Sequence, residues 1–416
     1  MRWTVRAALL ADGSVVAPAA WTVRAGRTAA LAPLEAGEAP VLDAVLLPAL
    51  VNAHAHLDLA GAPPIPARAS FTEWLLGVGA ARGDARDVEA AARDEARDLL
   101  LRGVVAVGDV DASGGRATRG RRAAGVGGRS YLEIVGVGAA SARARLAEAL
   151  ALADRLGDAG ALGLSPHAPY SVSAEVLSEI ARAARRRGLQ LAMHLAETPD
   201  ETRYLLHGDG PFADFLRVIG RGRPFDVPPR LRPVAYADRA GLLQAGCVVV
   251  HGNDLDADDV ELLAARGSSV VYCHGTHRHF DRPTHPLGRL LARGVNVALG
   301  TDSGLSNTGI DLLGEVRRLH AERDDLDPLD VLRCATLGGR RALRLAEGPA
   351  TLRPGSAADA LLLGAAPVDA ERLAPRALAA WALSPAAGVL ATLHGGHAQA
   401  GEAAPPGFLD TAEGHG

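Results

Sequence analysis

The sequence predicts an α/β protein: a closed (β/α)8 barrel of the TIM-barrel type, with a small flanking β-sandwich built from both chain ends. Between about Leu46 and Ser303, short apolar and β-branched runs alternate with stretches rich in Ala, Leu, Arg and Glu that have a helical period. Eight such units fit a closed parallel barrel in which a helix makes each crossover. An open, doubly wound parallel sheet has the same alternation, so periodicity alone leaves that second architecture open.

Eight segments are predicted as the barrel strands, in this order: Leu46–His54, Val104–Val110, Ser130–Val135, Ala161–His167, Gln190–His194, Cys247–His251, Ser269–Cys273 and Asn296–Gly300. Helices are predicted between them, over Val88–Arg102, Ala140–Arg155, Ala174–Arg187, Asp256–Ala265 and Pro286–Arg293. The barrel is expected to span residues 46–351. The chain of 416 residues is long enough for a barrel of about 250 residues with additions.

The two ends of the chain form short strands rather than helices. Residues 1–45 contain short apolar runs with turns at Asp12-Gly13 and Ala25-Gly26, and residues 352–400 contain similar runs. Neither piece is large enough to build a good core alone, so we expect them to pack together as one composite β-sandwich. Residues 401–416 are rich in Pro, Gly and small polar residues, which predicts a flexible tail.

The basic residues exclude several kinds of chemistry. All 44 of them are arginine, and the chain has no lysine. No lysine can therefore form a Schiff base, anchor pyridoxal phosphate, contact phosphate in a P-loop or, once carboxylated, bridge two metal ions. The net charge of −4 gives no polybasic surface, so neither nucleic acid nor an anionic membrane is expected as a partner.

The remaining composition is that of an ordinary globular enzyme. Three widely separated cysteines imply no disulfide framework. The first residues lack the apolar segment of a signal peptide, and no run of 18 apolar residues predicts a membrane span. We therefore expect a cytoplasmic enzyme that acts on a small molecule.

Polar residues of the kind that bind metals follow five of the predicted strands. His54 and His56 end the first strand and are two residues apart, so their side chains point to the same side. The other four strands end at His167, His194, His251 and Asp302. Barrel enzymes place their chemistry at the C-terminal ends of the strands, so these residues predict a metal-dependent active site there.

In these segments the sequence resembles the amidohydrolase superfamily, in its deaminase and chlorohydrolase branch with one divalent metal. The similarity covers nearly the whole chain and is carried by the segments LLPALVNAHAHLDL, SPHAPYSVSAE, MHLAET, VVVHGNDLDADDVELLA, GVNVALGTDS and RPGSAADALLL. Within the branch, the segments FTEWLLGV and GDGPFADFL are most similar to aminofutalosine deaminases of menaquinone synthesis.

The resemblance implies one divalent metal per chain, most often zinc and in some relatives iron. The implied metal ligands are His54, His56, His194 and Asp302. Glu197 would move a proton to the substrate ring nitrogen, His251 would hydrogen-bond the attacking water, and Asp302 would take a proton from that water. The implied partner is a small-molecule substrate, and a homodimer is expected from the family. The lack of lysine agrees with a single metal rather than a lysine-bridged pair.

Other residues are expected to contact the substrate. Trp74, His167 and Glu197 fall where relatives contact it. A cluster of histidines after the seventh strand faces the same barrel mouth, which makes His277 a further candidate; the cluster contains His274, His277, His279 and His285. Relatives often have Cys-Pro at the start of this loop, whereas this chain has Cys273 followed by histidine, and the difference leaves the substrate open. Asp58 is either a partner of the site or a helix-start residue.

The implied reaction is hydrolytic deamination of an aminated purine-like compound, with 6-amino-6-deoxyfutalosine as a candidate. A bound metal lowers the pKa of water from about 15.7 towards 7, and an acid such as Glu197 protonates the ring nitrogen so that ammonia can leave. A first alternative keeps the site and changes the leaving group, as in a chlorohydrolase acting on a triazine. A second alternative, of another class, is a non-catalytic metal- or ligand-binding protein.

Overall fold

The computed structural model describes residues 1–67, 70–83, 86–307, 309–345, 352–405 and 408–409. The chain divides into two compact units. The first, here called the sheet unit, comprises Met1–Asn52, Ala96–Ala106 and Asp311–Gly416. The second, here called the barrel unit, comprises Ala53–Glu95 and Val107–Ile310. All the candidate site residues predicted above belong to the barrel unit.

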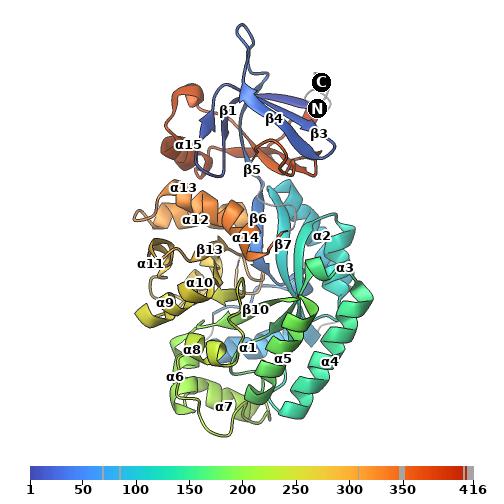
Figure 1. Cartoon of the computed structure of the whole chain (residues 1–416), viewed down its shortest axis with the longest axis vertical. Coiled ribbons are helices and arrows are strands. Elements are labelled where there is room, and N and C mark those ends of the chain that lie inside the picture. The colour runs from blue at the N-terminus through green and yellow to red at the C-terminus, as the bar shows by residue number, and fades with distance from the viewer. Residues whose placement is uncertain (68–69, 84–85, 308, 346–351, 406–407, 410–416) are drawn as a thin grey trace. The chain divides into compact units, whose positions relative to one another are not determined.

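Eight parallel strands form a barrel in strict sequence order (Figure 1). They are β6 (Leu50–Ala55), β7 (Val104–Asp111), β8 (Gly127–Ile134), β9 (Leu162–Pro166), β10 (Gln190–Leu195), β11 (Val248–His251), β12 (Ser269–Tyr272) and β13 (Asn296–Leu299). A parallel bridge between Ala55 and Asp302 joins the last strand region to the first. A doubly wound sheet would reverse its strand order, so the sequential order confirms the barrel and excludes the alternative.

One predicted strand is wrong in its extent. The segment Leu46–His54 is two strands in the structure, because β5 (Leu42–Pro48) ends at a proline and β6 begins at Leu50. Pro48 cannot donate a ladder hydrogen bond, which makes it a natural strand end. β5 pairs with the antiparallel β14 (Ala360–Gly364) in the other sheet, and only β6 belongs to the barrel. The apolar residues continue from β5 into β6, so the sequence pattern did not show where one strand ends and the next begins.

Helices alternate with the barrel strands, and the five predicted ones are present to within one residue at each end. The helices of this part of the chain are α1 (Phe71–Gly83), α2 (Val88–Leu101), α3 (Arg116–Ala123), α4 (Ala139–Leu156), α5 (Ala174–Arg187), α6 (Pro199–His207), α7 (Pro211–Val218), α8 (Pro233–Arg239), α9 (Ala257–Arg266), α10 (His274–His279) and α11 (Leu287–Ala292). Local sequence sets several of their ends. Asp256 and Asp259 form a reciprocal capping box at the start of α9, and Gly188 ends α5 in the left-handed conformation.

The second sheet has eight strands drawn from both chain ends. They are β1 (Arg2–Leu9), β2 (Val15–Val16), β3 (Ala19–Arg24), β4 (Arg27–Pro33), β5, β14, β15 (Gly388–His394) and β16 (His397–Ala400). Alternate residues of these strands, such as Trp3, Trp21, Leu362 and Leu393, meet in one apolar core. Because core residues from one face of a single sheet meet each other, the sheet curls around them.

The rest of the sheet unit is helical. Its helices are α12 (Leu312–Glu322), α13 (Pro328–Arg333), a π-helical turn at Cys334–Gly338, α14 (Gly339–Ala342) and α15 (Pro375–Ala382). The segment after Gly401, expected to be a flexible tail, lies partly outside the described residues. In its described part Phe408 is buried in the sheet core. The expected barrel end at residue 351 also lies outside the described residues, and the domain boundaries stay a prediction.

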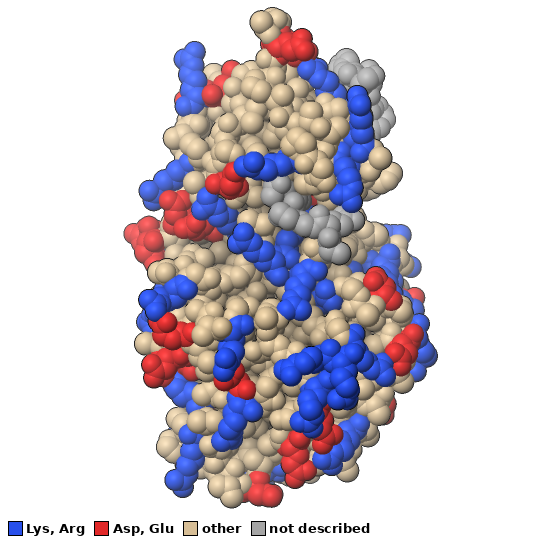
Figure 2. Space-filling model, viewed as in Figure 1, with Lys and Arg blue, Asp and Glu red and all other residues tan. Residues whose placement is uncertain are grey.

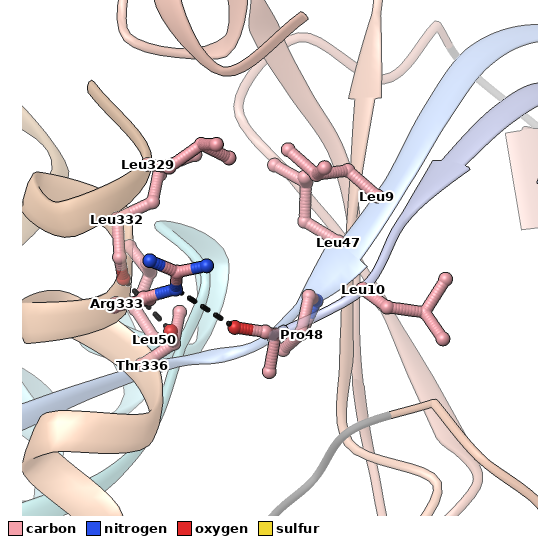
Figure 3. A pocket seen from close by; sticks show the side chains of 10 residues that line it. Leu9, Leu10, Leu47, Pro48, Leu50, Leu329, Leu332, Arg333 and Thr336 are labelled. Atoms are coloured by element: carbon pink, nitrogen blue, oxygen red, sulfur yellow. Dashed lines mark hydrogen bonds between the residues drawn. The ribbon is translucent and has the colours of Figure 1, made fainter. Parts of the chain in front are cut away.

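The sheet unit contains a small apolar pocket (Figure 3). It has about 20 Å³ of space for water-sized contents and is lined mainly by leucines, among them Leu47 and Leu332. Its polar lining groups are hydrogen-bonded: Arg333 donates to the carbonyl oxygen of Ala11 at 3.3 Å, and the Thr336 hydroxyl donates to that of Leu332 at 2.7 Å. The pocket is therefore a gap in packing and offers no group for chemistry.

Arginine and acidic side chains are mixed over the face shown in Figure 2, in keeping with the small net charge. Two exposed ion pairs join α4 to α5: Arg143 to Glu179 at 2.8 Å and Arg187 to Asp154 at 2.6 Å. Among the described helices, we find none with the length and apolar character needed to cross a membrane.

Candidate active site

The predicted metal ligands come from three different strands and meet at one place. His54 lies on β6, His56 directly follows the end of that strand, and His194 lies on β10. The backbone of Asp302 follows β13 and is fixed beside His54, because the Thr301 and Asp302 amides both donate to the His54 carbonyl oxygen, at 2.9 and 3.1 Å. The sequence therefore places three imidazoles and a carboxylate together, although they are up to 248 residues apart in the chain.

A glycine allows this approach of the first and last strands. A Cβ atom added at Gly300 would lie 2.9 Å from both the Cβ and the carbonyl oxygen of His54, closer than real Cβ contacts. Backbone strain accompanies the site as well. Asp302 has a φ of 57°, His251 a φ of 73° and Ala196 a φ of 52°, all in the left-handed region. Non-glycine residues adopt this region at a cost, and such residues cluster at functional sites.

The ligand atoms have the spacing of a metal coordination shell. His56 Nε2 lies 3.2 Å from His194 Nε2. Asp302 Oδ1 lies 3.7 Å from His54 Nε2 and 3.8 Å from His56 Nε2. Four atoms held about 2.1 Å from a common ion at tetrahedral angles would be about 3.4 Å apart. The residues present therefore fit a first-row divalent cation.

The pKa shifts of three of the four groups agree with this fit. Burial lowers the pKa of His54 and, together with neighbouring imidazoles, lowers that of His194 well below its ordinary value. Neutral imidazoles keep the lone pairs that a metal needs. Burial alone would raise the pKa of Asp302, but the neighbouring histidines, His54 first, outweigh it and hold that pKa low. A carboxylate that stays ionised is also what a cation site requires.

Buried partners orient two of the imidazole rings. Asp58 Oδ1 lies 3.6 Å from His56 Nδ1, and its contact with His56 outweighs burial and raises the pKa of that histidine. His194 Nδ1 contacts the carbonyl oxygen of His167 at 3.1 Å. Contacts at Nδ1 leave Nε2 of each ring directed at the proposed ion. Of the two roles left open for Asp58, the structure supports that of a partner of the site.

A second set of ionisable groups, missed by sequence reasoning, extends this support. Arg82 of α1 pairs with Glu133 of β8 at 2.9 Å and with Asp58 at 3.4 Å. Burial would raise the pKa of Glu133, but Arg82 outweighs it and keeps the pKa low. The three residues come from three separate elements, so no spacing in the sequence could have grouped them.

Glu197 and His251 lie beside the predicted metal ligands. Glu197 Oε1 is 3.7 Å from His251 Nε2, and both side chains are buried. Burial raises the pKa of Glu197 to about 8, and Arg282 opposes that rise only in part. Burial also lowers the pKa of His251 well below its ordinary value. At neutral pH the glutamate is therefore largely protonated and the imidazole is neutral.

The loop that presents Glu197 is held by a residue that the sequence analysis missed. Glu201 is fully buried, and its two carboxylate oxygens accept from the backbone amides of Ala196 and Glu197, at 3.2 and 2.9 Å. A sequence signal existed, because Thr198 begins α6 and Glu201 follows three residues later, the pattern of a capping box. Here the glutamate bonds amides just before the cap and so fixes the strained turn at Ala196.

Of the predicted substrate contacts, His167 lies against the predicted ligand His194, and Trp74 packs among aromatic rings of the barrel unit. The His167 ring centroid is 5.0 Å from that of His194, and His167 Nδ1 contacts the Ser171 hydroxyl at 2.8 Å. Trp74 is buried on α1 and packs edge-to-face on Phe280 with ring centroids 5.2 Å apart. The structure thus places both residues in the same unit as the ligands.

The histidine cluster after β12 forms hydrogen bonds and ring contacts. His277 Nδ1 contacts Asn253 Oδ1 at 3.2 Å, and the Asn253 amide donates to the Glu197 carbonyl oxygen at 3.1 Å. His285 Nε2 donates to the carbonyl oxygen of His251 at 3.0 Å. Within the described part of the chain, no group of residues suited to an ion includes this cluster. Two of its members, His277 and His285, therefore support the segments that carry Glu197 and His251.

Imidazoles and a carboxylate at the C-terminal ends of barrel strands, with a protonated acid beside them, are the arrangement of barrel enzymes that hydrolyse substrates with metal-activated water. Comparison with known proteins gives the family: the sequence model of the Amidohydrolase family matches residues 45–396, and this chain belongs to that family. The predicted resemblance is confirmed.

Relatives of known activity narrow the kind of reaction within this family. The chain is 33% identical to the aminodeoxyfutalosine deaminase of Deinococcus radiodurans over 321 residues. The matched region covers 72% of this chain and 73% of that protein. It is 30% identical over 350 residues to a 5-methylthioadenosine/S-adenosylhomocysteine deaminase of Natronomonas pharaonis, 80% of this chain and 75% of that one. The chain is a hydrolase acting on carbon–nitrogen bonds, and these relatives support a metal-dependent deaminase.

Solved structures share the fold. The aminofutalosine deaminase of Helicobacter pylori superposes with a TM-score of 0.80 at 20% identity, over 96% of this chain and 99% of that one. An adenosine deaminase of Xanthomonas campestris with bound zinc superposes with a TM-score of 0.75 at 23% identity, over 99% of this chain and 97% of that one. At these identities the similarity establishes the barrel fold, and the substrate has to be inferred from the residues of the site.

Proposed function

We propose that this chain removes the amino group of an aminated purine nucleoside by hydrolysis, with 6-amino-6-deoxyfutalosine, an intermediate of menaquinone synthesis, as the first candidate substrate. The observation that carries the proposal is the approach of His56 Nε2, His194 Nε2 and Asp302 Oδ1, with the buried carboxyl group of Glu197 beside them. The candidate substrate is favoured by the relative from Deinococcus radiodurans.

The proposed ligands of the cation are His54, His56, His194 and Asp302. One divalent ion, with zinc as our choice, would take this place, since three imidazole nitrogens and one carboxylate oxygen suit zinc and leave a position for water. When bound, such an ion lowers the pKa of that water towards 7 and so supplies hydroxide at neutral pH.

The chain's own residues would move the protons. Glu197 carries a proton at neutral pH because burial raises its pKa to about 8, so it can protonate the ring nitrogen next to the C–NH2 carbon. Protonation makes that carbon accept the oxygen of water, and the amino group then leaves as ammonia. The neutral imidazole of His251, 3.7 Å from Glu197, is placed to hydrogen-bond the attacking water.

Asp302 is held ready to accept a proton from the attacking water. The hydroxyl groups of Thr276 and Ser306 donate to its Oδ2, at 3.1 and 3.3 Å. These bonds occupy Oδ2, whereas Oδ1 is the atom that approaches His54 and His56. The carboxylate therefore has one oxygen fixed by hydroxyls and the other facing the reaction centre. The proton that it accepts from water would pass to the amino group, which leaves as ammonia, and the remaining hydroxyl proton would return to Glu197 as the ring carbonyl forms.

The test is ammonia release from a panel of adenine nucleosides that includes 6-amino-6-deoxyfutalosine, 5′-methylthioadenosine, S-adenosylhomocysteine and adenosine. We expect turnover of at least one adenine nucleoside and the highest kcat/KM for 6-amino-6-deoxyfutalosine. Chloride release from a halogenated triazine, with no ammonia from the whole panel, would instead favour the chlorohydrolase alternative.

A further inference from the structure

Arg282 places a buried guanidinium group beside the proposed proton donor. Its side chain is only 9% exposed and lies between α10 and α11 in the sequence. Its Nη2 atom is 3.8 Å from Glu197 Oε1, beyond hydrogen-bond distance. Within the described residues, its Nε and Nη2 atoms are buried and have no hydrogen-bond acceptor. Leaving charged donors buried without an acceptor is costly, so this arrangement calls for a ligand.

Aromatic rings hold the guanidinium in place without occupying its donors. Its central carbon lies 5.2 Å from the centroid of the Phe71 ring and 5.0 Å from that of Phe280. Trp74 packs against the same two rings, and its buried Nε1 atom also finds no acceptor among the described residues. Contacts of a cation with ring faces leave its N–H groups free to bond.

Of the acidic residues near Arg282, Glu197 lies 3.8 Å from Nη2, too far for a hydrogen bond, and Glu201 is bonded elsewhere. The oxygens of Glu201 already accept from the backbone amides of Ala196 and Glu197. Arg82, another buried arginine of the site, shows the contrast, because its guanidinium pairs with Glu133 at 2.9 Å. Arg82 also has a buried Nε without a hydrogen bond, but that atom lies 3.4 Å from Asp58 Oδ2, as in a structural ion pair. Both the Nε and the Nη2 of Arg282 lack a hydrogen-bond acceptor among the described residues.

We infer that Arg282 binds a carboxylate group of the substrate and thereby sets which adenine nucleoside is preferred. The inference rests on the proposed deamination, because the carboxylate must belong to the molecule whose ring reaches Glu197. A guanidinium can donate two parallel hydrogen bonds to a carboxylate, and the surrounding rings suit an aromatic or apolar neighbour of that group. A substrate with a benzoate substituent fits both features, and a nucleoside with a neutral methylthio group fits only the rings.

The test compares two substrates with the same adenine ring. 6-Amino-6-deoxyfutalosine carries a benzoate, and 5′-methylthioadenosine carries no anion. In Arg282→Met, which keeps the length and loses the charge, we expect kcat/KM for the benzoate substrate to fall about 10- to 100-fold, mainly through KM. The value for methylthioadenosine should change less than about threefold, and Arg282→Lys should lie between the two. Arg289→Met removes an exposed arginine of α11 and is the matched control, with no change for either substrate.

A binding measurement separates this inference from the proposed function. Calorimetry should detect benzoate binding to the wild-type holoenzyme more tightly than the neutral isostere benzamide, and Arg282→Met should remove that difference. Equal losses on both substrates would show that Arg282 serves Glu197, and unchanged constants would show that it contacts no anion; either result overturns the inference. If no adenine nucleoside reacts, the proposed function fails, and the benzoate comparison still decides whether Arg282 is an anion site.

Discussion

Two buried carboxyl groups, one in each compact unit, have opposite surroundings. Asp359 of the sheet unit pairs with Arg340, contacts His394 Nδ1 at 2.9 Å and accepts from the Gly395 amide at 2.8 Å. Burial raises its pKa, but these partners, His394 first, outweigh burial and bring the pKa to about 2. Glu197 of the barrel unit has the neutral imidazole of His251 at 3.7 Å and the guanidinium of Arg282 at 3.8 Å, and burial raises its pKa to about 8.

The difference separates a structural carboxylate from a chemical one. A buried carboxylate with a cation in direct contact stays ionised, and its charge stabilises the fold. A buried carboxyl group with distant partners stays protonated at neutral pH and can give its proton to a substrate. The comparison implies that loss of Glu197 should affect the reaction more than stability, and that loss of Asp359 should do the reverse.

The largest expected effect comes from removing the metal. Dialysis of the enzyme against a chelator should abolish ammonia release, because the proposed ligand set is then four buried groups without the ion that activates water. We expect about one equivalent of zinc per chain to restore full activity, as followed by metal analysis and turnover on the same sample. Recovery that requires two equivalents would contradict the single-metal assignment.

Glu197→Gln should come next in size. Glutamine has nearly the shape of a protonated glutamate and cannot deliver a proton, so we expect kcat to fall by about 100-fold or more. Metal content should stay near that of the wild type, and the melting temperature should move by less than about 2 °C. An enzyme that keeps full turnover after this change would refute the proton-transfer role.

Asp359→Asn should lower the stability of the protein and leave its activity unchanged, the opposite of Glu197→Gln. Removing one charge from a buried ion pair costs about 3 kcal/mol of unfolding free energy, measured by denaturation at pH 7. Activity per folded molecule should be unchanged, since Asp359 belongs to the sheet unit.

The effect of Asp359→Asn should also depend on pH. The folded-state pKa of about 2 lies below the ordinary value of about 3.9, so the wild-type advantage is present above pH 4 and lost as the pH falls through 2. An advantage that stays constant down to pH 2 would show that packing, not charge, stabilises this pair.

The sequence predicted the part of the site that strand periodicity controls. His54, His56, His194, His251 and Asp302 each stand at or just after the C-terminal end of a strand, and a barrel brings those ends together whatever the loops do. A local pattern was therefore sufficient to group residues that are far apart in the chain.

The remaining parts of the site depend on packing between loops and helices. Arg82 and Arg282 reach the site from a helix and a loop, whose placement no strand period encodes, and in the sequence they look the same as exposed arginines. Glu133 lies one residue before the end of β8, but nothing else in the sequence distinguishes it from an exposed glutamate. The boundary at Pro48 was missed for a related reason, because both strands beside it are apolar and buried. Burial and partner distances decide the role of such groups, and both appear only in the folded chain.

The smallest effect expected concerns Glu201, which is buried like Glu197 but bonded to backbone amides. Burial raises its pKa to about 8, above the ordinary value of about 4.3. The folded state therefore binds more protons than the unfolded state between these values, and stability falls as the pH rises through this window. Glu201→Gln cannot ionise, so the fall in melting temperature from pH 6 to pH 8.5 should be smaller in the variant than in the wild type. The variant also loses one hydrogen bond from a backbone amide, but that cost is the same at both pH values and cancels when the decreases in melting temperature are compared. Equal decreases in the two proteins would mean that the two amides keep Glu201 ionised throughout this range.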